Sequence, residues 1–170
     1  MDLTVHLLCL TCLMASVFSQ TAPLKCKKNK SLPTDEVYTT RYKQICLEFH
    51  NTPQLWSEAK ETCKKSERFL AKLDTVDLWG FVLEITRFLA WDVYWIGAHN
   101  EAGKLEYKWS DDTQAELFWG KDPANLEAGH CAVMQSSGYV KPEDCEKKHK
   151  FVCTSAMPAK KVKPQNTTAA

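Results

Sequence analysis

The chain has 170 residues, of which 44% are hydrophobic and 11% aromatic, and its formal net charge is +1. This length and composition suffice for one globular domain with a real core, so they exclude an intrinsically disordered chain. A net charge so close to zero lacks the excess of basic residues that is typical of nucleic-acid-binding proteins, and we expect no nucleic-acid partner.

The first segment, residues 1–19, contains no Lys or Arg, is mostly apolar and ends in small residues. This pattern predicts a secretory signal peptide, and therefore a secreted, extracellular protein with no membrane contact. The alternative is a membrane anchor, which needs about 20 apolar residues. This run is shorter and is interrupted by Thr11 and Ser16. Cys9 and Cys12 have the spacing of a redox pair but lie inside the segment predicted to be removed, so we assign them no function.

Six further cysteines follow: Cys26, Cys46, Cys63, Cys131, Cys145 and Cys153. An even number in a secreted chain predicts disulfides, although spacing alone does not choose among the pairings. Zinc binding is the alternative. It is disfavoured because no two of these cysteines have Cys-x-x-Cys spacing.

The segment before the domain, residues 20–37, is polar and rich in lysine, so it reads as an N-terminal extension held by Cys26. Residues 38–41 and 45–49 alternate well enough for two short strands, and residues 50–53 have the composition of a turn. The sequence therefore predicts a hairpin at the start of the domain.

Two helices are expected next. The first begins with Thr52 as N-cap and Pro53 in the first turn, and its inner face carries Leu55, Trp56, Ala59 and Cys63. After a short apolar link at residues 69–73, the second helix spans residues 76–89 and can be capped by Asp74 or Thr75. Its apolar residues form a broad stripe at helical spacing, which is typical of a core-facing helix.

The apolar run at residues 93–98 predicts a central strand that is buried on both faces, because it contains no polar residue. A long loop region follows at residues 100–125. It requires buried side chains to hold it, and the candidates are Leu105, Tyr107, Trp109, Phe118 and Trp119. Short strands are expected at residues 131–134, 139–140 and 151–153, and a disordered tail at residues 155–170.

Residues 38–154 resemble the C-type lectin-like domain family. The motifs that carry the resemblance are Cys46-x-x-Phe49, Trp56-x-x-Ala59 before Cys63, Trp95-Ile96-Gly97, Trp109-Ser110-Asp111, Trp119, and Cys131, Cys145 and Cys153. The resemblance implies an α+β fold, with two helices packed on small antiparallel sheets, the termini paired near the base and a long loop projecting opposite.

The resemblance also implies a disulfide framework, in which Cys63 pairs with Cys153 and Cys131 pairs with Cys145. Cys26 and Cys46 would then form the extra bridge of the long-form members. The alternative for Cys26 is a bond to a second copy of the chain, which would make a homodimer.

In sugar-binding members of the family, calcium is held by an acid-Pro-Asn or Gln-Pro-Asp triplet in the long loop, by an acid just before the next cysteine, and by a Trp-Asn-Asp triplet. Here Asp122-Pro123-Ala124, with Pro123 expected in the cis form, replaces the first triplet. Gly129 and His130 replace the acid, and Val140-Lys141-Pro142 replaces the last triplet. Calcium needs roughly six to eight oxygen ligands. We therefore expect no cofactor and an absent or weakened calcium site.

Four other groups could supply oxygens near that site: Asn125, Glu127, Glu143 and Asp144. We interpret them as solvated loop side chains. If a metal site were rebuilt, Asp122 and Glu127 would be its candidate ligands. His99 and His130 are interpreted as surface histidines, although either could face a ligand or respond to pH.

The function we expect is secreted recognition, with a glycan as the first-choice ligand. The candidate ligand-binding residues are Trp119, Asp122, Pro123, Asn125, Glu127, Tyr139 and Lys141. The alternative is an extracellular protein or a mineral surface, bound without sugar chemistry. No Ser-His-Asp set, buried carboxylate pair or phosphate loop is present, so we do not expect an enzyme. Asn29 and Asn166 begin glycosylation sequons, which fits secretion.

Overall fold

The computed structural model describes residues 26, 36–101, 104, 106–120 and 130–155. The predicted signal peptide, most of the N-terminal extension, the C-terminal tail and both sequons lie outside these residues. So do Leu105 and the loop candidates Asp122, Pro123, Asn125 and Glu127.

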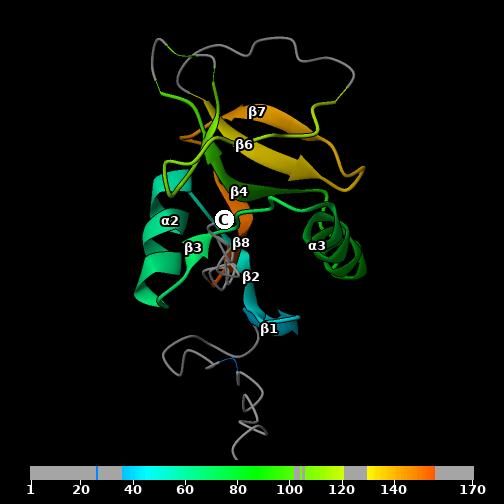
Figure 1. The fold of residues 1–170 in the computed structure, drawn as a ribbon. Coiled ribbons are helices and arrows are strands. Elements are labelled where there is room, and N and C mark those ends of the chain that lie inside the picture. The colour runs from blue at the N-terminus through cyan, green and yellow to red at the C-terminus, as the bar shows by residue number, and fades with distance from the viewer. Residues whose placement is uncertain (1–25, 27–35, 102–103, 105, 121–129, 156–170) are drawn as a thin grey trace, which may run out of the picture.

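Eight strands and two helices make up the described chain (Figure 1). They are β1 (Val37–Tyr42), β2 (Ile45–Gln54), α2 (Trp56–Lys65), β3 (Phe69–Leu70), α3 (Val76–Phe88), β4 (Val93–His99), β5 (Lys108–Trp109), β6 (His130–Gln135), β7 (Val140–Asp144) and β8 (His149–Thr154). The strand order is β1-β2-β8-β4-β6-β7, with β3 added to β8 and β5 added to β4. The α+β class is confirmed.

The sheet is mixed, whereas the sequence predicted small antiparallel sheets. β4 and β8 pair in parallel, with Trp95 opposite Phe151, and this pair joins the strands on either side into one sheet. A parallel pair needs a long connection between its strands, and here everything from β5 to β7 supplies it. β2 pairs with β8 so that Leu47 lies opposite Thr154, which brings the two ends of the domain together as expected.

The two helices lie on opposite sides of the central strands (Figure 1). Tyr94 and Ile96 of β4 belong to one hydrophobic cluster with Leu78 of α3. Trp95 lies in the other cluster with Trp56 of α2. Successive side chains of a strand point to opposite faces, so β4 contributes to both clusters. The prediction of a central strand buried on both faces is confirmed.

Gly97 interrupts this apolar strand for a steric reason. Its N–H donates to the carbonyl oxygen of Ala71 at 2.8 Å. A Cβ at position 97 would overlap the carbonyl oxygen of Leu70 and lie 2.9 Å from its carbonyl carbon. Only glycine allows this backbone approach. The predicted apolar link at residues 69–73 thus lies against β4, and its first two residues form β3.

The first helix begins later than predicted. β2 continues through Pro53 to Gln54, so the expected turn at residues 50–53 is extended strand. The Thr52 hydroxyl donates to the Glu36 carboxylate at 2.9 Å and does not cap the helix. α2 begins at Trp56, and the Leu55 N–H donates to the Glu58 side chain at 3.1 Å.

The second helix matches its prediction closely. The Thr75 hydroxyl caps α3 by accepting the Leu78 N–H at 3.3 Å, and the helix ends at Phe88. The expected strands after the loop region correspond to β6, β7 and β8. Of the proposed loop anchors, Tyr107 and Trp109 are buried, but Phe118 is 52% exposed and does not anchor the loop.

Three disulfides link the described residues. They join Cys63 to Cys153, Cys131 to Cys145, and Cys26 to Cys46. This is the framework that the resemblance implies. Cys26 is therefore bonded within the chain, which corrects the alternative of a bond between two copies.

Candidate functional site

The segment before the long loop lies beside β7. Trp119 and Val140 form a parallel bridge. The Val140 N–H donates to the Phe118 carbonyl at 2.8 Å, and the Gly120 N–H donates to the Val140 carbonyl at 3.1 Å. These bonds place two predicted ligand residues, Trp119 and Tyr139, on neighbouring backbone segments.

Phe118 and Tyr139 expose their aromatic rings here. Phe118 is 52% exposed and Tyr139 is 46% exposed. The Phe118 ring packs edge-on against Trp79 of α3, with 5.0 Å between ring centroids. The Trp79 indole N–H donates in turn to the Gly138 carbonyl at 3.0 Å, so α3 supports both sides of this surface. We call Phe118 and Tyr139 the aromatic surface.

Trp119 is less available than the sequence suggested. Its side chain is half-buried and packs edge-on against Tyr107, with 4.8 Å between ring centroids. Burial raises the pKa of Tyr107 to about 12, so this phenol stays neutral. Trp119 therefore supports the loop from inside, while Phe118, which was predicted as an internal anchor, faces solvent.

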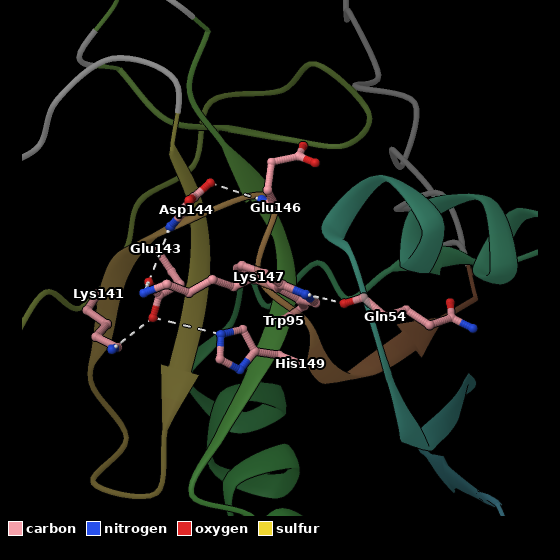
Figure 2. A network of polar contacts seen from close by, with 8 residues as sticks. All are labelled: Gln54, Trp95, Lys141, Glu143, Asp144, Glu146, Lys147 and His149. Atoms are coloured by element: carbon pink, nitrogen blue, oxygen red, sulfur yellow. Dashed lines mark hydrogen bonds and ion pairs between the residues drawn. The ribbon is translucent and has the colours of Figure 1, made fainter.

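Lys141, the third described ligand candidate, belongs to a polar cluster centred on Glu143 (Figure 2). The Lys141 ammonium lies 3.1 Å from one carboxylate oxygen of Glu143, and the Lys147 ammonium lies 2.6 Å from the other. His149 Nε2 lies 3.8 Å from the first oxygen. Burial alone would raise the pKa of Glu143, but the hydrogen bonds from Lys147 and Lys141 hold it below its usual range.

This arrangement corrects the interpretation of Glu143 as a solvated loop acid. Glu143 lies within β7, and its side chain is only 11% exposed. Asp144 at the end of the strand is exposed, and its carboxylate accepts the Glu146 N–H at 3.0 Å. By the sequence resemblance, neither carboxylate matches a calcium ligand of the sugar-binding members.

The described part of the family's calcium site does not suit a metal. Lys141 places an ammonium where the resemblance expects an asparagine oxygen, and the Pro142 side chain offers no oxygen. Each oxygen of Glu143 already accepts a lysine ammonium. A divalent cation at β7 would face these ammonium groups at close range, which is electrostatically unfavourable.

The two histidines singled out by the sequence lie in strands and not in loops. His99 ends β4 and packs against Trp56, with 4.7 Å between ring centroids. Burial lowers the pKa of His99, and the nearby Lys60 adds to this shift. His130 begins β6, where its N–H donates to the Asn100 side chain at 2.6 Å. Both residues therefore have structural contacts within the fold.

A buried charged cluster, which no sequence pattern indicated, joins β2 to the segment after α2. Glu48 is fully buried, 3.1 Å from the Arg68 guanidinium and 3.4 Å from His50 Nε2. Ligand atoms of Glu48, His50 and Cys153 lie within 4.8 Å of one another. Cys153 is bonded to Cys63 and offers no thiolate, and Glu48 is neutralised by Arg68, so this cluster is an ion-pair core and not a metal site.

Within the described part of the chain, no helix combines the length and apolarity needed to cross a bilayer.

A family model, the lectin C-type domain, matches residues 52–155. Human lithostathine-1-beta (Homo sapiens) is 30% identical over 123 residues, which cover 68% of this chain and 74% of that protein. The chain also matches C-type lectin domain family 2 proteins of Rattus norvegicus and Mus musculus, and spans about half of their length or less.

Two solved structures illustrate the shared fold. The SPL-1–GlcNAc complex superposes with a TM-score of 0.66 at 18% identity, covering 79% of this chain and 97% of that one. A calcium-independent type II antifreeze protein superposes with a TM-score of 0.60 at 20% identity, covering 74% and 94%. Proteins of this family are generally binding domains and not enzymes. The chain belongs to the family of C-type lectin domains.

Proposed function

We propose that this domain is a secreted recognition module that binds a glycan without calcium, through the aromatic surface and Lys141. The observation that carries the proposal is the Lys141–Glu143 ion pair at the position of the family's calcium ligands. A mostly buried carboxylate holds this ammonium in place. Because the ammonium occupies the position of a calcium ligand, the ligand would be recognised by protein side chains and not by a bound calcium ion. Sugar binding and calcium independence both occur in proteins of this fold, since its structural relatives include a GlcNAc complex and a calcium-independent protein.

Each of these side chains offers a contact that a sugar needs. The exposed rings of Phe118 and Tyr139 can stack on the apolar CH groups of a sugar ring, and packing on Trp79 keeps the Phe118 ring in place. Lys141 is 42% exposed and has three donors, of which Glu143 takes one. The remaining donors can reach a sugar hydroxyl or an acidic substituent.

Secretion is part of the same proposal. The disulfides Cys26–Cys46, Cys63–Cys153 and Cys131–Cys145 require an oxidising compartment to form and persist. The predicted signal peptide at residues 1–19 would direct the chain to such a compartment.

The test is binding of the oxidised protein to a panel of immobilised glycans, in excess EDTA and again with calcium. We expect the same glycans to be bound in both conditions, and Tyr139→Ala to weaken binding at least tenfold. Tyr38→Ala is the matched control. Tyr38 is 44% exposed but lies on β1, at the opposite edge of the sheet from β7.

Two outcomes would contradict the proposal. Binding that appears only with calcium would show that residues of the long loop have rebuilt the metal site. No glycan binding at all, together with capture of an extracellular protein or mineral that Tyr139→Ala abolishes, would favour the alternative ligand class for the same surface.

A further inference from the structure

A separate cavity of about 270 Å³ lies between the start of β2, β3, the first turn of α3 and the end of β8. It is lined by residues that the proposed glycan site does not use. In Figure 1, β3 and β8 lie below β6 and β7. Lys141 belongs to β7, and Tyr139 lies in the turn that joins β6 to β7. The cavity is slightly smaller than the roughly 300–1,000 Å³ of drug-sized ligand sites, so it suits one side chain or a small molecule.

The walls of this cavity are partly apolar. Ile45 and Leu78 are buried core residues that close its inner side. Phe69 of β3 also lines it and is 45% exposed. A hydrocarbon stem placed here would be covered by these three side chains, and burial of its CH₂ groups would favour binding.

The cations near the cavity are already neutralised. The Lys72 ammonium donates to the Asp111 carboxylate at 2.7 Å and contacts the Thr113 hydroxyl at 2.6 Å. Lys43, two residues before Ile45, pairs with Asp77 at 3.1 Å. Burial alone would raise the pKa of Asp111, but hydrogen bonds from Lys72 and Thr113 hold it below its usual range, so this carboxylate stays charged.

Asp74 is the charged group of the cavity lining that these ion pairs leave out. It lines the cavity as an exposed side chain, and the nearby lysines Lys43 and Lys72 pair with Asp77 and Asp111 instead. It does not cap α3, because Thr75 takes that role. The lining therefore contains two carboxylates, from Asp74 and Asp111, and one ammonium, from Lys72, which leaves an excess of one negative charge.

We infer that this cavity binds a primary ammonium group on an apolar stem, such as a lysine side chain, with the stem between Phe69 and Leu78 and the ammonium on Asp74. Two sources share this chemistry. One is an external amine or lysine-bearing polypeptide. The other is this chain itself, because Ser155 lines the cavity and the sequence that follows it contains Lys160, Lys161 and Lys163.

The experiment is calorimetric or NMR titration of the full oxidised chain with Nα-acetyl-lysine amide. We expect saturable one-site binding, and no binding of Nα-acetyl-norleucine amide, which keeps the stem but lacks the ammonium. Asp74→Asn should weaken lysine binding at least tenfold, and Phe69→Ala should weaken it about threefold to tenfold.

Asp112→Asn is the matched control, because Asp112 is an exposed neighbour of Asp111 that does not line the cavity. It makes the same change in net charge and should leave the affinity unchanged. Equal weakening by Asp74→Asn and Asp112→Asn would show that the ammonium responds only to the net charge of the protein and not to a specific carboxylate. This result would overturn the inference. Absence of binding to wild type at millimolar lysine amide, in the chain with and without the tail lysines, would overturn it as well.

A third variant separates the two sources. Replacing Lys160, Lys161 and Lys163 with Ala in the full-length chain removes the internal candidates. If the tail occupies the cavity, this variant should bind added lysine amide at least tenfold more tightly, because a tethered competitor at millimolar effective concentration is gone. An unchanged affinity identifies the external source. Loss of Nα-acetyl-lysine amide binding does not affect the glycan test, which depends on Tyr139 at the other site.

Discussion

The Glu48 carboxylate lies 3.1 Å from the Arg68 guanidinium, and both side chains are buried beneath the sheet surface that α2 covers. His50 lies 3.4 Å from the same carboxylate and stacks on Phe151, with 4.3 Å between ring centroids. Glu48 and His50 come from β2, whereas Arg68 comes from the chain just after α2. This ion pair therefore connects the first hairpin to the helical part of the domain.

Removing one partner of this pair should be costly. We expect Arg68→Met to lower the free energy of unfolding by about 3–5 kcal/mol, because it leaves the Glu48 carboxylate buried without a counter-ion. Urea denaturation of the oxidised protein measures the loss. The double variant Glu48→Leu/Arg68→Met should recover much of it, since no uncompensated charge remains. The control is Lys43→Met at the exposed Lys43–Asp77 pair, which should cost less than about 1 kcal/mol. A loss of similar size at both pairs would contradict this interpretation.

Gly97 and Gly80 offer a matched pair of substitutions. We expect Gly97→Ala to destabilise the domain by about 3 kcal/mol, because the new Cβ overlaps the Leu70 carbonyl and backbone must move. Gly80→Ala in α3 should instead raise stability by about 0.5–1 kcal/mol, since nothing lies within 4 Å of the new Cβ and alanine favours the helix. Thermal unfolding of the two variants distinguishes these effects. Equal changes at both positions would show that close approach at β4 does not matter.

Patterns along the chain predicted the elements that are long and periodic. Local sequence alone identifies α3, through its apolar stripe and its Thr75 cap. It also identifies β4, through the unbroken apolar run. β3 and β5 were missed because two residues show no alternation. The start of α2 was misplaced because Thr52 and Pro53 have cap and first-turn chemistry. In the structure β2 stays extended as far as Gln54, which pairs with His149 of β8 beyond a register shift.

The candidate site was predictable only in part. Lys141 and Glu143 are two residues apart on one strand, so their side chains share a face, and that signal is present in the sequence. The burial of Glu143 and the exposure of Phe118 depend on how the loop and α3 pack, which no local pattern contains. Arg68 could not be matched to Glu48 for the same reason, because their contact joins segments that only the fold brings together.

Acidification should destabilise the domain through His149. Its ring packs edge-on against Trp95 and faces Glu143, Lys141 and Lys147, and burial lowers its pKa below the ordinary 6.5. As the pH falls through 6.5, the unfolded chain therefore takes up a proton before the folded chain does, and folding becomes less favourable. We expect the contribution of His149 to the free energy of unfolding to be constant above pH 6.5 and to decrease as the pH falls below 6.5.

His149→Gln tests this prediction by removing the titrating group while keeping a polar side chain. Denaturation at several pH values between 7.5 and 5 should show a shallower decrease in the variant than in wild type. His99 has a lowered pKa as well and stays in both proteins, so part of the slope should remain. Identical slopes would show that protonation of His149 costs the folded state nothing.

Calcium should have no measurable effect on this protein. The Lys141 ammonium is held at the metal position by Glu143, and Pro142 adds no side-chain oxygen, so β7 lacks the ligands that calcium requires. We expect calorimetric titration of calcium into the oxidised protein to give no saturable heat, and the melting temperature to be the same in calcium and in EDTA. Saturable binding at one site, lost on replacing Asp122 and Glu127, would contradict the prediction. It would place the metal in the long loop and make calcium-dependent glycan binding the leading function. Lys141→Asn provides the complementary experiment. It restores one family ligand and removes the lysine from one oxygen of Glu143, while Lys147 stays on the other. Any calcium affinity that the variant gains over wild type measures how far Lys141 excludes the ion.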